Sequence, residues 1–169
     1  MKKLFFLLLS APVFAQAQDC TMLRRDRDPY TKEVRISTGQ MLVGSGHKVS
    51  VEATAKEIDM FFVLSANGAC FNDQSTMVTN FTGTRTRATY KNGGTMNCEG
   101  YFHILFRNGQ EPVYGLRKLL DQKVATFTFG EGKDALIITL TEEQKEILQR
   151  SLTCIVNEAK GLLPPPPVQ

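Results

Sequence analysis

The sequence lacks the spaced ionisable residues by which most catalytic and metal sites are recognised. It contains only two histidines, His47 and His103, and no pair of its four cysteines has C-x-x-C spacing. No phosphate-binding loop, dinucleotide-binding fingerprint or metal-binding helix motif is present. We therefore expect neither a cofactor nor a bound metal, and the enzyme classes defined by those motifs are excluded.

The chain also lacks a large excess of charge of either sign. Its formal net charge is +3, and removing an N-terminal leader that carries Lys2 and Lys3 lowers this by two, to +1. Such a balance favours neither nucleic acid nor a strongly anionic surface as partner. We expect no membrane span once the leader is removed, because the apolar run at residues 4–9 is too short to cross a bilayer.

The N-terminus has the features of a secretory signal peptide: Lys2 and Lys3, the apolar run, and small residues at a cleavage site after Ala17 or after Ala15. We predict a signal peptide at 1–17, one domain at 18–161 and a disordered Pro-rich tail at 162–169. Cys20 follows the leader closely, but the residues before it do not form a lipobox. A soluble secreted or periplasmic product is expected.

All four cysteines fall in the predicted mature chain. An even count in an exported protein indicates two disulfides, for which three pairings are possible. We expect Cys20 to pair with Cys154, and Cys70 to pair with Cys98. A zinc site is the alternative, which the cysteine spacing disfavours.

The clearest structural pattern lies near the C-terminus. Residues 123–129 alternate like a strand, residues 130–134 suit a hairpin, and residues 135–140 are apolar on both faces, which predicts a strand inside the sheet. Thr141 and Gln144 form a capping box, and apolar residues then recur at helical spacing up to Ala159.

Upstream, short alternating runs predict further strands, and Pro112 opens a short helix. The charged residues 24–31 are interpreted as a segment that turns at Asp28 and Pro29, before the first strand. The predicted class is α+β: an antiparallel sheet of about six to eight short strands with a C-terminal amphipathic helix and one short helix packed on it. The alternative is a β-sandwich with a C-terminal helix.

Three residues form a possible ligand face: Arg85, Arg87 and Tyr90. The competing interpretation is a solvated edge strand whose cations discourage aggregation. Ser45 and His47 lie in a glycine-rich segment that is interpreted as a turn, because it lacks the nucleophile-elbow pattern. His103 is interpreted as a hydrogen-bonded sheet residue.

Some features resemble a group of short exported proteins of unassigned function in Bacteroidota. These are the signal peptide, the early Cys20, the turn of Asp28, Pro29, Tyr30 and Thr31, and a strand-hairpin-helix end with a late cysteine. The glycine that often follows the threonine in that turn is replaced here by Lys32. The resemblance implies a bacterial, periplasmic or cell-surface setting and no catalytic residue.

The preferred hypothesis is a non-enzymatic binding or interaction module whose partner is an envelope protein or a glycan. Two alternatives remain open. The chain could be a small subunit of a cell-envelope complex, or a hydrolase with an unrecognised site that uses His103 or Asp59.

Overall fold

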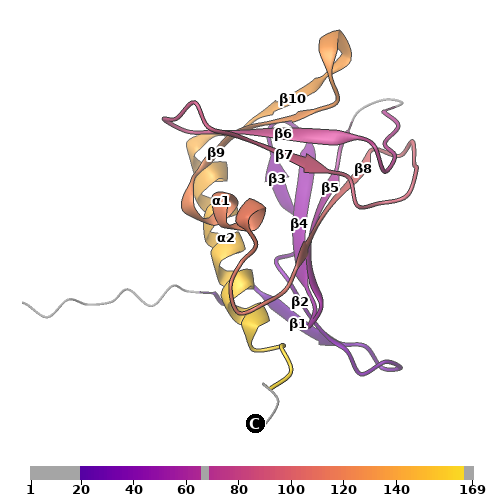
Figure 1. Cartoon of the computed structure of the whole chain (residues 1–169), viewed down its shortest axis with the longest axis vertical. Coiled ribbons are helices and arrows are strands. Elements are labelled where there is room, and N and C mark those ends of the chain that lie inside the picture. Colours follow the sequence, from indigo (N-terminus) through magenta and orange to yellow (C-terminus); the bar gives the residue numbers. More distant parts are fainter. Residues whose placement is uncertain (1–19, 66–68, 166–169) are drawn as a thin grey trace, which may run out of the picture.

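The structure is a computed structural model that describes residues 20–65 and 69–165. This part of the chain contains ten strands, two α-helices and one 3-10 turn (Figure 1). The strands form two antiparallel sheets and the long C-terminal helix packs against them, so the predicted α+β class is confirmed.

The larger sheet has one buried face and one exposed face. Its strands are, in spatial order, β1 (Arg24–Arg27), β2 (Val34–Ser37), β4 (His47–Ala53), β5 (Glu57–Val63) and β8 (Tyr101–Arg107), with β3 (Met41–Val43) paired to β4. Along β4, β5 and β8, every second side chain is buried. The inner face forms the core, and the outer face meets solvent.

The smaller sheet covers one end of that inner face. Its strands are, in spatial order, β10 (Leu136–Thr139), β9 (Val124–Phe129), β6 (Thr76–Phe81) and β7 (Arg87–Lys91). They run across the strands of the larger sheet (Figure 1). The two sheets meet where the ring of Phe62 lies edge-on to Phe127 and Phe129, at centroid distances of 5.1 and 5.2 Å.

Helix α2 (Glu142–Lys160) covers the rest of the inner face. It begins at Thr141, which forms the predicted capping box with Gln144, and it buries one stripe of side chains that includes Leu148, Leu152 and Ile155. Helix α1 (Tyr114–Asp121) packs on α2 and against β7. Neither helix of the described chain combines the length and the apolar character needed to cross a bilayer.

Two disulfides join distant parts of the chain. One links Cys20 to Cys154 and the other links Cys70 to Cys98, which are the two pairs expected from the sequence. The first attaches the N-terminal end of the described chain to the buried side of α2. The second closes the segment that contains β6 and β7.

Three expectations need correction. The described residues form ten strands rather than six to eight. The charged segment 24–27 does not precede the first strand but is itself strand β1, which pairs with β2 while all four of its side chains stay exposed. Strand β10 is not inside a sheet but at the edge of the smaller one, and Ile137 on its outer face is 62% exposed.

The predicted signal peptide at 1–17 lies outside the described residues, as does the end of the predicted tail, 166–169. The start of that tail is described. Leu162 is partly buried against the core, and its backbone N–H donates to the carbonyl of Ala159. Ordered contacts therefore extend past Gly161.

Candidate functional site

The outer face of the larger sheet carries a cluster of aromatic and ionisable side chains on β5 and β8. Inward and outward residues alternate, so the inward Met60 and Phe62 force Asp59 and Phe61 outward. Residues Tyr101, His103 and Leu105 of β8 point outward for the same reason. We call Asp59, Phe61, Tyr101 and His103 the outer-face cluster.

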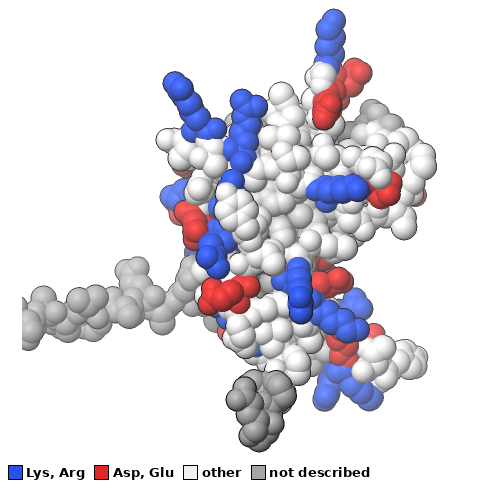
Figure 2. Space-filling view, in the orientation of Figure 1, with Lys and Arg blue, Asp and Glu red and all other residues white. Residues whose placement is uncertain are grey.

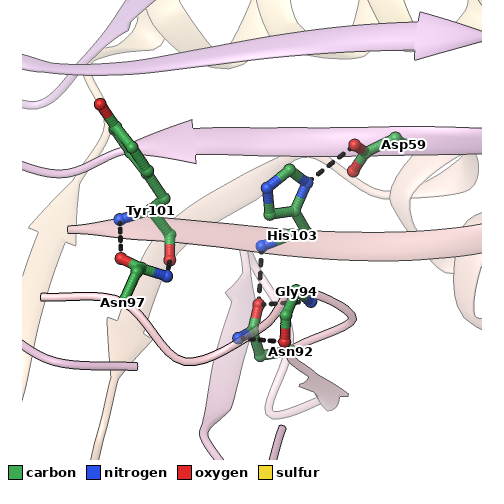
Figure 3. A network of polar contacts seen from close by, with 6 residues as sticks. All are labelled: Asp59, Asn92, Gly94, Asn97, Tyr101 and His103. Carbon is green, nitrogen blue, oxygen red and sulfur yellow. Dashed lines mark hydrogen bonds and ion pairs between the residues drawn. The ribbon is translucent and has the colours of Figure 1, made fainter. Parts of the chain in front are cut away.

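Asp59 and His103 form a pair across the two strands. The register places His103 directly beside Phe61, so Asp59 lies at the diagonal position. His103 Nδ1 lies 2.8 Å from Asp59 Oδ2, and the two side chains are 31% and 25% exposed (Figure 3). The pair is therefore partly shielded but accessible to a ligand.

This contact determines how His103 can interact. A carboxylate oxygen accepts a hydrogen bond, so Nδ1 carries the proton in the pair, and in the neutral ring Nε2 keeps its lone pair. The ring is held flat against Phe61, with centroids 4.5 Å apart and planes 24° apart. Tyr101 lies edge-on to Phe61 at 5.5 Å. The cluster thus combines ring surfaces with an oriented hydrogen-bond acceptor.

The backbone of β8 is held from the side opposite β5 by the loop that follows β7. The side chain of Asn97 accepts from the Tyr101 N–H at 3.0 Å and donates to the Tyr101 carbonyl at 3.0 Å. The Asn92 side chain accepts from the His103 N–H at 2.9 Å, and the Gly93 N–H donates to the His103 carbonyl at 2.9 Å. Two asparagine side chains thus replace a neighbouring strand (Figure 3).

A charged hollow of about 280 Å³ adjoins the cluster on the same face. Asp59 lies on its wall, and its Oδ1 atom is buried without a hydrogen-bond partner in the described chain. The other lining residues are mostly charged and come from β2, β4, β5 and the adjoining turns: Glu33, Arg35, Glu52, Thr54, Lys56 and Glu57. Within 20–65 and 69–165, no group of three His, Cys, Asp or Glu side chains could hold a metal ion.

The ligand face expected at Arg85, Arg87 and Tyr90 is not formed as a unit. Arg85 lies in the turn before β7, and Arg87 is exposed on β7. Tyr90 points to the other side of that strand, where it is only 6% exposed and its hydroxyl donates to the Gly115 carbonyl. Burial raises the pKa of Tyr90 well above its ordinary value. Side chains of β7 alternate between its two faces, so Tyr90 lies on the core-facing side with Ala88 and not on the side of Arg87.

Ser45 lies in the expected turn between β3 and β4, and His47 is the first residue of β4. The Ser65 N–H donates to His47 Nδ1 at 3.1 Å, so the proton of the neutral ring lies on Nε2. An imidazole that accepts through Nδ1 in this way has no free lone pair with which to activate Ser45. His103 therefore differs from His47 in its tautomer, and it is the histidine whose free nitrogen can accept from a ligand.

Charge does not single out another site on the face shown in Figure 2, where basic and acidic side chains alternate around uncharged surface. Comparison with family models, with curated proteins and with solved structures found no match. The sequence signal for the site was limited to its separate strands. The alternation of 101–106 indicates which residues of that strand share a face, and the apolar run 58–64 indicates a central strand, but nothing in the sequence indicated that Asp59 would meet His103.

Proposed function

We propose that this protein is a non-enzymatic binding module that acts outside the cytoplasm and binds a saccharide on the outer-face cluster. The observation that carries the proposal is the combination of exposed ring surface and the oriented Asp59–His103 pair on one open sheet face. Two disulfides are compatible with an oxidising compartment, which supports the expected export.

The chemistry of the cluster suits a sugar ring. A pyranose presents C–H groups on one face, which pack on aromatic surface, and hydroxyl groups at its rim, which need oriented hydrogen-bond partners. Tyr101 is 39% exposed and supplies ring surface and a hydroxyl. His103 Nε2 can accept from a sugar hydroxyl, while Arg35 and Glu52 in the adjoining hollow supply a donor and an acceptor.

The test is calorimetric titration of the mature protein with a panel of cell-envelope oligosaccharides. Tyr101→Ala and His103→Ala should each weaken binding by roughly tenfold, the factor that corresponds to about 1.4 kcal/mol. Thr89→Ala is the matched control, because Thr89 is exposed on the smaller sheet and is not part of the cluster. Binding that is unchanged in both site variants, or lost equally in the control, would contradict this location.

A hydrolase is the second candidate, and the same pair favours it. A histidine that is oriented by a carboxylate and keeps Nε2 free is the arrangement of a general base. No described hydroxyl or thiol group hydrogen-bonds to His103, so the base would act on a water molecule. Hydrolysis of nitrophenyl esters or glycosides that is lost in His103→Gln would favour this candidate. Saccharide binding without turnover would contradict it.

A further inference from the structure

The loop that holds β8 is attached to the rest of the molecule beside an exposed disulfide. We call residues 92–98 the clamp segment, because its side chains and backbone make the four hydrogen bonds to Tyr101 and His103 described above. The disulfide joins Cys98, the last residue of this segment, to Cys70. The disulfide is therefore adjacent in sequence to Asn97.

Tyr101 and His103 each direct one backbone N–H and one carbonyl away from β5. The four hydrogen bonds from the clamp segment satisfy all of these groups. The Leu64 N–H donates to the Gly100 carbonyl. In this antiparallel pair, the even-numbered residues of β8 therefore direct their backbone N–H and C=O groups toward β5. Tyr101 and His103 consequently point their N–H and C=O groups toward the clamp segment. Without that segment, this edge of β8 would exchange its partners for water.

The clamp segment lies directly against the candidate site. A Cβ atom added at Gly94 would come within 2.9 Å of His103 Cδ2, so the glycine backbone packs flush against the imidazole. Asn92 is 4% exposed, and its Oδ1 also accepts from the Gly94 N–H. Movement of the segment therefore changes both the backbone and the ring environment of His103.

The anchor of the clamp segment at its Asn97 end is short. Asn97 and Phe71 exchange two backbone hydrogen bonds, of 2.8 and 2.9 Å, as an isolated bridge next to the disulfide. At the other end of the segment, Asn92 Nδ2 donates to the Asn72 carbonyl at 3.0 Å, and the Asn92 N–H donates to the Ser75 carbonyl at 2.9 Å. Since Cys70 and Cys98 flank this bridge and are both exposed, the covalent link is accessible to solvent at the point where the clamp is held.

We propose that Cys70–Cys98 is a redox switch for the outer-face cluster: reducing it loosens the clamp segment and weakens ligand binding at Tyr101 and His103. The reductant is an external dithiol. One of its thiolates attacks one cysteine sulfur, which forms a mixed disulfide and releases the other cysteine as a thiolate. The second thiol of the reductant then attacks the reductant's own sulfur in the mixed disulfide and releases the first cysteine. Two electrons and two protons pass to the protein, which gains two thiols, and the dithiol becomes a cyclic disulfide.

The second disulfide provides an internal control. Cys154 is fully buried in α2, whereas both partners of the other bond are exposed. Mild dithiothreitol treatment followed by alkylation and mass spectrometry should therefore label Cys70 and Cys98 while Cys20 and Cys154 stay joined. Labelling of all four cysteines together would overturn selective switching.

Amide hydrogen exchange tests the clamp without requiring a ligand. In the reduced protein, and in a Cys70→Ser/Cys98→Ser variant without reductant, exchange at Tyr101 and His103 should rise by roughly tenfold, while amides of β4 that face β5 stay protected. Unchanged exchange at Tyr101 and His103 would overturn the proposal.

The binding arm rests on the proposed function, and the two failures can be told apart. Saccharide affinity should fall on reduction in the native protein, and it should be low and insensitive to reductant in the double variant. If exchange responds but no saccharide binds to the oxidised protein, the ligand assignment fails and the clamp stands. If the oxidised and reduced proteins bind equally tightly, the switch is overturned and the binding site stands.

Discussion

At the scale of single residues, side-chain amides replace backbone partners at several places where strands end. Gln144 makes three such hydrogen bonds. Its Oε1 accepts from the N–H groups of Thr141 and Gly44, both at 3.1 Å, and its Nε2 donates to the Gly44 carbonyl at 3.1 Å. One side chain thus caps α2 and joins that helix to the turn between β3 and β4.

Gln144→Ala should lower the free energy of unfolding by about 2 kcal/mol, because three partly shielded backbone groups lose their partner. Glu143→Ala is the control, since Glu143 is an exposed neighbour in the same first turn and its loss affects only the helix dipole, by a few tenths of a kcal/mol. Urea unfolding of both variants measures the difference. Equal effects would mean that the bridge to Gly44 contributes nothing.

Lys32 is the one non-glycine residue of the described chain with a positive φ, at +60°. It closes the turn in which Asp28 Oδ1 accepts from the N–H groups of Tyr30 and Thr31, contacts that hold the pKa of Asp28 below its ordinary value. A side chain in this conformation costs roughly 1 kcal/mol, which glycine avoids.

Lys32→Gly should therefore be more stable than Lys32→Ala by about 0.5 to 1 kcal/mol. Both variants lose the ammonium contact with the Pro29 carbonyl, so their difference isolates the Cβ atom. Thermal unfolding at one pH and ionic strength provides the comparison. A glycine variant less stable than the alanine variant would show that the turn changes conformation when Lys32 is replaced.

At the scale of elements, the sheet edges are protected in different ways, and β10 exposes an apolar side chain at its edge. Strand β1 exposes four charged side chains, β8 is covered by the clamp segment, and at β7 the Lys118 ammonium donates to the Arg87 carbonyl. Strand β10 instead exposes Ile137 at the edge of the smaller sheet. Exposed apolar edge strands favour association between chains.

Ile137→Lys should change the free energy of unfolding by no more than about 0.5 kcal/mol and should reduce self-association at high concentration. Ile138→Lys is the contrast, because Ile138 is 2% exposed and a buried unpaired ammonium should prevent folding. Light scattering and chemical unfolding measure the two effects. If Ile137→Lys unfolds the protein, β10 is buried in solution by a contact that the single chain does not show.

Local patterns predicted the elements whose side chains alternate between core and solvent, and failed where both faces have the same character. Strand β1 was missed because Arg24, Arg25, Asp26 and Arg27 are all exposed, which leaves no period of two. Strand β10 was placed inside a sheet because its apolar residues do not reveal that one face is open. The Asp59–His103 contact depends on the register of β5 with β8, which joins residues 44 positions apart. No local pattern contains that register.

At the scale of the whole molecule, the two disulfides differ in the length of chain that they close. Cys20 and Cys154 are separated by 134 positions, which is nearly all of the described chain, and Cys70 and Cys98 are separated by 28. In the chain-entropy account, a disulfide stabilises the fold by restricting the unfolded state, and its effect grows with the logarithm of the loop length. The N-terminal link should therefore contribute more, even though Arg25 and Glu158 form an ion pair beside it.

Replacing Cys20 and Cys154 together by alanine should lower the free energy of unfolding by about 5 kcal/mol, against about 3.6 kcal/mol for the Cys70 and Cys98 pair. Urea unfolding under non-reducing conditions gives both values. The variant that lacks Cys70 and Cys98 should bind saccharide more weakly than the variant that lacks Cys20 and Cys154. The first pair lies beside the outer-face cluster, whereas the second joins the distant end of α2. A protein in which both pairs affect stability and binding in parallel would have no local clamp, and the site would depend only on global folding.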